Sequence, residues 1–273
     1  MSWEGLTGAG VSYSPSRIES ERFGMSIARV VVGDEVGGAD EVADDLARVL
    51  GESDDDLLVV RWPARLATLG AVAAGTPRRI LPADVLTYWE APADALRLDA
   101  EAAGRAGCRV RVPQEADERS LAALDAVVAD SFRGYGNHYT ANPALDPELA
   151  LLGYQDWSRR SLLANPGDVV LLEHVDVEHA AVEHPQPDVV GVATLAQSQD
   201  GHDLEILLAG LVGGSQGQGW YSHLLGGVGD AARRRGASRV VISTQVHNIR
   251  VQRAWARAGF KPYAAVTTVH AMR

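Results

Sequence analysis

Apolar residues along the chain occur either in short continuous runs or at helical spacing, and the two patterns alternate. The short runs predict buried strands because β-branched and aliphatic side chains dominate them. In the first third of the chain these predicted strands are residues 26–32, 57–61 and 79–89. Residues 40–50 carry apolar side chains on one helical face after Asp40, a candidate N-cap, and residues 63–74 predict a helix opened by proline.

The same alternation continues to the end of the chain. The predicted strands are residues 109–113, 169–177, 189–198, 204–212, 239–246 and 263–272. The predicted helices are residues 117–132, 148–163, 219–235 and 249–258, and residues 134–147 predict an ordered loop. Strands that alternate with helices predict an α/β fold.

The length and the breaks in this pattern suggest two parts. A chain of 273 residues forms one large domain or two small ones. The first twenty residues, rich in serine and glycine, predict a loose lead-in, and residues 91–107 predict a connection between halves. We therefore expect domains at residues 1–104 and 105–273.

Composition and charge exclude several classes of protein. With 46% hydrophobic and 22% charged residues, the chain is neither disordered nor fibrous. A net charge of −11 argues against a nucleic-acid binder. From Gln216 onward, however, nine basic side chains stand against one acid, Asp230. This basic segment indicates either a small polyanionic ligand or a solvated surface.

The cysteine count, the apolar runs and the histidines add three expected absences. Cys108 is alone, and neither a membrane-spanning run nor a signal peptide is visible, so we expect a cytoplasmic protein without a membrane partner. His174, His179 and His184 are five residues apart, which suits neither a helical pair nor a zinc pattern. We therefore expect no metal.

A glycine-rich turn carries the most specific chemistry. The apolar run 204–212 leads through residues 213–219, of sequence GGSQGQG, directly into a predicted helix. Glycines let the backbone come close to a ligand, and the first N–H groups of a helix have no partner within it. Such a turn is suited to binding a phosphate or pyrophosphate.

Around this turn the chain resembles the GNAT superfamily of acyl-CoA-dependent N-acetyltransferases. Gln216, Gly217, Gln218 and Gly219 match the coenzyme motif of that family, with Trp220 following, although Tyr221 stands where glycine or alanine is usual. Asn248, followed by Gly259-Phe260, matches a second family element. The resemblance implies a mixed, strongly twisted sheet flanked by helices, and acetyl-CoA or another acyl-CoA as cofactor. The implied coenzyme-binding residues are Leu211, Val212, Gln216, Gly217, Gln218, Gly219, Trp220, Tyr221, Asn248, Arg250 and Arg253.

A looser resemblance extends to dTDP-fucosamine acetyltransferase and its relatives. It rests on residues 19–24, 132–157 and 244–248. It implies that the first half is a partial GNAT-like unit without its own coenzyme turn. It also implies an acceptor that is a small amine, such as an amino sugar on a nucleotide or in a natural product.

Acyl transfer to an amine needs a base, an N–H donor for the thioester oxygen and a proton for the leaving thiolate. Glu205 and His138 are the candidate bases, against the alternatives of a paired strand position and a loop-bracing histidine. The resemblance places the N–H donor on a bulged strand around Leu211 and Val212. Many relatives have a tyrosine that protonates the leaving thiolate, but at that position this chain has Trp255, whose indole cannot give up its proton. Tyr263 and Tyr221 are substitutes by residue type only, or the thiolate leaves unassisted.

Two other functions remain open at this point. Trp255 and Tyr221 also fit a non-catalytic module that binds acyl-CoA or a small molecule. A protein N-acetyltransferase is the third candidate, which the long aromatic loop disfavours. A homodimer is left open.

Overall fold

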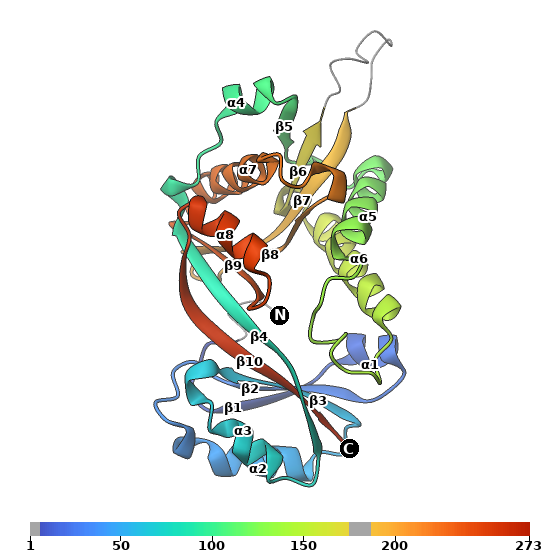
Figure 1. Cartoon of the computed structure of the whole chain (residues 1–273), viewed down its shortest axis with the longest axis vertical. Coiled ribbons are helices and arrows are strands. Elements are labelled where there is room, and N and C mark those ends of the chain that lie inside the picture. Colours follow the sequence, from blue (N-terminus) through green and yellow to red (C-terminus); the bar gives the residue numbers. More distant parts are fainter. Residues whose placement is uncertain (1–5, 175–186) are drawn as a thin grey trace.

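The structure is a computed structural model that describes residues 6–174 and 187–273. Its strands form one mixed sheet in the order β1-β2-β3-β10-β4-β9-β8-β7-β6-β5 (Figure 1). The strands are β1 Val11–Pro15, β2 Ile27–Val32, β3 Leu57–Pro63, β4 Arg79–Pro92, β5 Cys108–Arg111, β6 Val169–His174, β7 Asp188–Gln197, β8 Asp203–Leu211, β9 Arg239–Gln245 and β10 Lys261–Met272. The helices are α1 Arg17–Phe23, α2 Ala43–Glu52, α3 Leu69–Ala74, α4 Ala100–Arg105, α5 Glu118–Phe132, α6 Pro147–Ala164, α7 Trp220–Arg234 and α8 Ile249–Arg257.

Two long strands, β4 and β10, join the first and second parts of the chain. The last strand, β10, lies between β3 and β4 and pairs antiparallel with both. On its other edge β4 pairs with β9, so strands from both parts share one sheet (Figure 1). The division into residues 1–104 and 105–273 stays a prediction.

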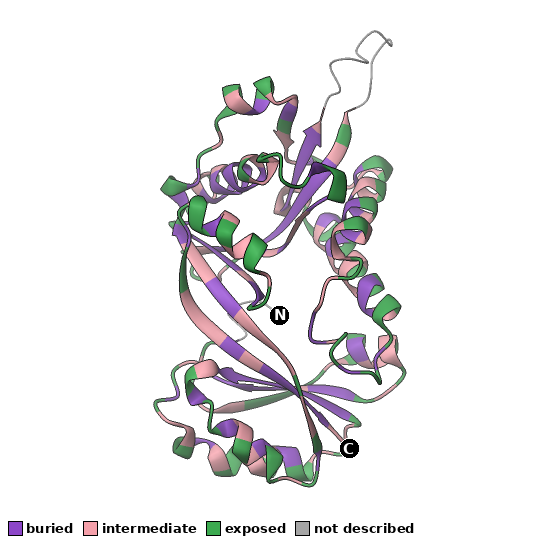
Figure 2. Ribbon diagram, viewed as in Figure 1, coloured by how far each residue is buried: buried purple, intermediate pink, exposed green. Residues whose placement is uncertain are grey.

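Apolar side chains explain how the helices pack on this sheet. In α2, Leu46 and Leu50 are fully buried against the apolar face of β2 and β3, together with Leu69 of α3. In α7, Leu224 and Val228 are buried against the strands of the second part. Figure 2 shows buried residues on the strands and on the inner faces of these helices. Removing this apolar surface from water is the main stabilising contribution to such packing.

Strands β8 and β9 separate along their length. Their parallel pairing runs from Asp203 with Arg239 to Ile206 with Ile242 and then ends. Both strands continue, β8 to Leu211 and β9 to Gln245. Beyond Ile206 in β8 and Ile242 in β9, the backbone N–H and C=O groups on the facing edges of the two strands therefore face a gap rather than each other.

Three predicted elements differ from the structure. The expected loose lead-in contains β1 and α1, because Val11–Pro15 pairs antiparallel with β2 at an exposed edge that carries no periodic apolar signal. The helix predicted from Pro63 is only the short α3, since β3 continues to Pro63 by pairing with Val266. The expected connection at 91–107 contains α4, whose first turn is capped by Asp99.

Among the described residues, no helix is long and apolar enough to cross a membrane, and no group of three or more metal-binding side chains gathers. His179 and His184, considered above for their spacing, lie outside the described residues.

Candidate functional site

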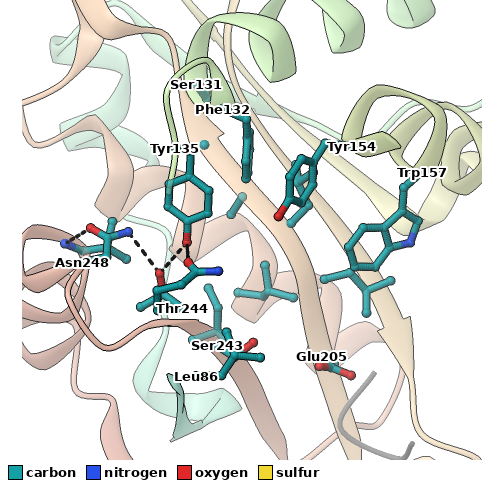
Figure 3. A pocket seen from close by; sticks show the side chains of 18 of the residues that line it. Leu86, Ser131, Phe132, Tyr135, Tyr154, Trp157, Glu205, Ser243, Thr244 and Asn248 are labelled. Atoms are coloured by element: carbon teal, nitrogen blue, oxygen red, sulfur yellow. Dashed lines mark hydrogen bonds between the residues drawn. The ribbon is translucent and has the colours of Figure 1, made fainter. Parts of the chain in front are cut away.

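A cavity of about 1110 Å³ lies between the two parts of the chain. Its lining comes from β1–β4 and α1 of the first part, and from β8, β9, α7, α8 and the α5–α6 region of the second. Figure 3 shows aromatic side chains of the α5–α6 region above the strands that carry Glu205 and Thr244. Residues of both parts of the chain therefore form the cavity wall.

The glycine-rich turn forms one end of this cavity. Gly217 and Gly219 have positive φ angles of 87° and 83°, a conformation that favours glycine. Within the described structure, the backbone N–H groups of residues 217–221 donate no hydrogen bond. Gln216 is fixed on both sides, because its Nε2 donates to the Leu211 carbonyl at 3.1 Å and its Oε1 accepts from Arg250 Nη1 at 2.8 Å. Unsatisfied N–H groups at the start of α7, beside Arg250, fit a pyrophosphate.

The strand beside the turn, β8, differs from the expectation in two details. The N–H of Val212 donates to the Val190 carbonyl at 2.9 Å, so Val212 is not the available donor. Successive strand residues turn their N–H groups to opposite sides, and the Leu211 carbonyl already faces Gln216. The N–H of Leu211 therefore points away from β7, into the gap beside β9. The irregularity in pairing with β7 lies between Ile206 and Leu208, not at Leu211–Val212 as expected.

Glu205 lies on β8 further along the same wall. It is 7% exposed, faces Val241 of β9 and Ala196 of β7, and lines the cavity. Figure 3 shows its carboxylate on the side of the pocket that Trp157 overhangs. A carboxylate in this position can accept a proton from a group that enters the cavity.

Tyr135, Thr244 and Asn248 connect the α5–α6 loop to the start of α8. Asn248 Nδ2 donates to Thr244 Oγ1 at 3.0 Å, and Thr244 Oγ1 lies 2.8 Å from the Tyr135 hydroxyl, which donates to Gln245 (Figure 3). Asn248 also caps α8 through its Oδ1. Asn248 thus acts as a structural link at the cavity wall.

Trp255 and Tyr221 meet inside the cavity wall. The indole N–H of Trp255, a residue only 2% exposed, donates to the Tyr221 hydroxyl at 3.1 Å. Burial raises the pKa of Tyr221 to about 12, so this hydroxyl keeps its proton at neutral pH. The oxygen accepts from Trp255, which leaves the phenolic hydrogen to donate elsewhere.

His138 belongs to a buried chain of hydrogen bonds. The Asn142 carbonyl oxygen accepts from the Ala144 amide, so its Nδ2 is the donor to His270 Nδ1 at 3.0 Å. His270 therefore carries its proton on Nε2 and donates it to His138 Nδ1, also at 3.0 Å. This assignment leaves His138 with Nε2–H as a donor rather than a lone pair. Burial and the charge of Arg61 lower the pKa of both histidines, that of His270 to about 4.

Sequence reasoning missed the charged floor that the first part contributes. Arg61 of β3 is 7% exposed and lines the cavity. Glu19 of α1 accepts from Arg29 Nε at 2.8 Å and from the Tyr139 hydroxyl. Burial raises the pKa of Glu19, but the hydrogen bond and the charge of Arg29 outweigh this effect and hold the pKa at about 2. The sequence signal for these residues was a single arginine within each of two otherwise apolar predicted strands, 27–32 and 57–62. A charged side chain is rarely buried unless it is paired or binds a ligand.

Several expected site residues do not line the cavity. Gln218 donates to the Gly214 carbonyl, Trp220 stacks on His174, and Arg253 is exposed on α8. Tyr263 packs edge-on against Tyr88 at 6.3 Å under Arg239. Val212, whose N–H donates to the Val190 carbonyl, does not line the cavity either. The remaining predicted residues do line it: Glu205, His138, Leu211, Gln216, Gly217, Gly219, Tyr221, Asn248 and Arg250.

The basic segment after Gln216 serves mainly structural contacts. Arg233 donates to the carbonyls of Ala93 and Leu96, and Arg235 pairs with Asp168 at 2.7 Å. Arg239 pairs with Glu90 and Asp203. Of the nine basic side chains in this segment, only Arg250 and Arg257 line the cavity, so the charge of the segment does not by itself mark a ligand site.

Comparison with known proteins places the fold. No family model and no curated protein matches the sequence. A GCN5-related N-acetyltransferase from Sphaerobacter thermophilus superposes over 95% of this chain and 76% of its own, with a TM-score of 0.56 at 15% identity. A glucosamine N-acetyltransferase region of a fungal multi-domain β-N-acetylglucosaminidase superposes with a TM-score of 0.56 at 11% identity, over 95% of this chain and 31% of its own.

A third similar structure is a tandem GNAT protein from the clavulanic acid biosynthesis pathway. It gives a TM-score of 0.52 at 15% identity, over 90% of this chain and 75% of its own. At these identities the likeness concerns architecture only. The chain has the GNAT fold, a mixed sheet flanked by helices that it shares with known N-acetyltransferases.

Proposed function

We propose that the protein is an acetyl-CoA-dependent N-acetyltransferase that acts on a small amine. The observation that carries this proposal is the continuity of one cavity from the unsatisfied N–H groups of residues 217–221 to the Glu205 carboxylate. An anion-binding turn and a candidate base are thereby joined by the gap between β8 and β9.

The coenzyme would bind at the turn and in the gap between the strands. Residues 217–221 and Arg250 would hold its pyrophosphate, and the free N–H of Leu211 would receive a hydrogen-bond acceptor in the gap. When bound, acetyl-CoA supplies a thioester as the acetyl donor. The absence of competing hydrogen bonds at these N–H groups supports this fit.

Glu205 would be the general base, directly or through a water molecule. An alkyl amine has a pKa near 10 and must lose a proton before it attacks a carbonyl. The alternative base, His138, has its Nδ1 lone pair occupied by the hydrogen bond from His270. This favours Glu205 over His138 and gives His138 the role of a donor toward the cavity.

Tyr221 would supply the proton to the departing thiolate. Trp255 occupies the position at which many GNAT enzymes have a tyrosine, and it holds the hydroxyl of Tyr221 at 3.1 Å. A neutral phenol with a raised pKa is a proton donor at neutral pH. Tyr263, the other tyrosine considered, lies outside the cavity lining.

The acceptor would be a small amine such as an amino sugar. The α5–α6 region covers the cavity, and the Tyr135 hydroxyl closes on β9 through Thr244. Such cover suits a compact acceptor better than an extended polypeptide. One similar structure is named a glucosamine N-acetyltransferase region and another comes from the clavulanic acid biosynthesis pathway, which is in keeping with this substrate class.

Release of free thiol from acetyl-CoA, measured against a panel of amino sugars, simple amines and peptides, tests the proposal. We expect release with amino sugars and a loss of at least about 100-fold in kcat for Glu205→Gln. Coenzyme binding without turnover on any amine would instead indicate a non-catalytic binding module. Turnover confined to peptides would indicate a protein acetyltransferase.

A further inference from the structure

We propose that Trp157 selects a cyclic acceptor, because its indole stacks on the apolar face of a sugar ring whose amine points toward β8. This inference rests on the proposed function, to which it adds a specificity-determining residue and the form of the substrate. It concerns the wall of the cavity that α6 contributes.

One face of α6 lines the cavity. Five residues of the helix belong to the lining: Ala150, Gly153, Tyr154, Trp157 and Arg160. Their spacing of three and four positions places them on one side of a helix. Leu162, which is outside this spacing, packs into the core instead. The helix therefore presents a continuous stripe to the cavity, and Trp157 is the largest side chain on it.

The aromatic rings of this wall differ in what they contact. Phe132 stacks on Tyr154 with ring centroids 4.9 Å apart and meets Tyr135 edge-on at 5.3 Å. The Trp157 side chain is half-buried, and within residues 6–174 and 187–273 it forms neither a ring contact nor a hydrogen bond. Figure 3 shows this indole apart from the other three rings. An aromatic face exposed inside a cavity is an apolar surface that a ligand can bury.

Contacts with the first part of the chain hold this segment of α6 in place. Arg22 of α1 pairs with Asp156 at 3.3 Å. The same guanidinium lies against Gly153, where a Cβ would come within 2.6 Å of Arg22 Nη1. Because Trp157 directly follows Asp156, these contacts fix the backbone that carries the indole. A ring on a fixed backbone loses little conformational freedom when a ligand stacks on it.

The position of the indole indicates which portion of the acceptor it contacts. In the proposed function the amine attacks a thioester in the gap between β8 and β9. Trp157 lies above these strands on α6 (Figure 3), so it faces the body of the acceptor rather than the amine. A pyranose presents C–H groups on its faces and hydroxyls at its rim. The face suits an indole, and the rim suits polar lining residues such as Ser243 of β9 and Asp84 of β4.

Binding measured without turnover tests this inference. The protein, labelled with ¹⁵N at its six tryptophans and saturated with CoA, is titrated with glucosamine or with glucosaminitol while the indole N–H signals are followed by NMR. Glucosaminitol has the same amine and carbon chain but no ring. We expect glucosamine to shift the Trp157 signal, which Trp157→Phe identifies, and to bind about 10-fold more tightly than glucosaminitol.

Variants assign this preference to the indole. Trp157→Ala should reduce the preference to less than about 2-fold and leave the affinity for glucosaminitol unchanged, whereas Trp157→Phe, which keeps an aromatic face, should retain part of it. Leu163→Ala is the matched control, because Leu163 is exposed on the same helix and does not line the cavity. The affinity of each variant for CoA checks that it is folded, and Trp157→Phe decides if Trp157→Ala does not bind CoA.

The possible outcomes separate this inference from the proposed function. Equal affinities of the wild type for the two probes, or a preference that survives in Trp157→Ala, would overturn the stacking. A Trp157 signal that shifts with CoA alone and not with glucosamine would overturn it as well. A preference that depends on Trp157, without acetyl transfer to any amine, would support the stacking and contradict the proposed function.

Discussion

The indole N–H of Trp255 donates a hydrogen bond to the hydroxyl of Tyr221 across 3.1 Å, between α8 and the first turn of α7. The tryptophan and the tyrosine that differ from the residues implied by the sequence resemblance therefore form one contact. In the proposed mechanism, Trp255 would orient this hydroxyl and Tyr221 would supply the proton.

Tyr221→Phe tests this assignment. Removing a general acid lowers a rate by about 10²–10⁴-fold, so we expect kcat to fall by about 100-fold with little change in the KM for acetyl-CoA. Trp255→Phe leaves the phenol but loses its orientation, and should lower kcat only several-fold. Steady-state kinetics measure both. An unchanged kcat in Tyr221→Phe would mean that the thiolate leaves without this proton.

Gly219→Asp tests the coenzyme turn. A carboxylate at this position would stand beside the N–H groups that we assign to the pyrophosphate, so affinity for CoA should fall by about 100-fold or more. Gly236→Asp is the matched control, because Gly236 also has a positive φ, has open space around its Cα and lies beyond the other end of α7. Calorimetric titration with CoA measures both variants. Equal affinities would show that the pyrophosphate binds elsewhere.

Arg29→Met tests the buried pair under the cavity. It leaves the Glu19 carboxylate, whose side chain is 3% exposed, without its cation, and we expect a loss of about 3–5 kcal/mol in the free energy of unfolding at pH 7. Arg17→Met removes the partner of Glu21 from the solvent face of the same helix and should leave the free energy of unfolding nearly unchanged. Urea denaturation compares the two. Similar losses would show that the Arg29 pair is not buried in solution.

The histidine chain makes stability depend on pH. The pKa of His270 falls from an ordinary 6.5 to about 4 on folding, so the unfolded chain binds a proton more readily. Stability is therefore fully present above pH 6.5 and is lost as the pH falls toward 4. Linkage gives a loss of about 2 kcal/mol from this histidine between pH 7 and pH 5.

His270→Gln isolates this contribution, because an amide can still accept from Asn142 and donate to His138. We expect the variant to lose less stability than the wild type between pH 7 and pH 5, as followed by urea denaturation midpoints at both pH values. An equal loss in the two proteins would assign the pH dependence to other groups.

The parts of the fold that sequence could predict are those with strong local signals. The apolar runs that became β2, β3 and β8 and the periodic stretches that became α2, α5 and α7 are specified by residues close together in the chain. The edge strand β1 and the extension of β3 to Pro63 depend on partners far along the sequence, at β2 and β10. Local patterns carry no information about such pairing.

The same distinction applies to the candidate site. The turn at Gln216–Gly219 could be predicted because glycine spacing and the helix start are local features. The role proposed for Tyr221 could not, since it depends on a contact with Trp255, 34 residues further along the chain. Arg61 reaches the cavity only because β10 inserts between β3 and β4, an arrangement that no local motif encodes.

The transfer of an isotope-labelled acetyl group from acetyl-CoA to glucosamine, followed by mass spectrometry together with free thiol, tests the central claim most directly. We predict one acetylated amine for each thiol released, and the loss of both products in Glu205→Gln. Thiol release that yields only free acetate, or equal transfer by the wild type and Glu205→Gln, would contradict an N-acetyltransferase that uses Glu205 as its base.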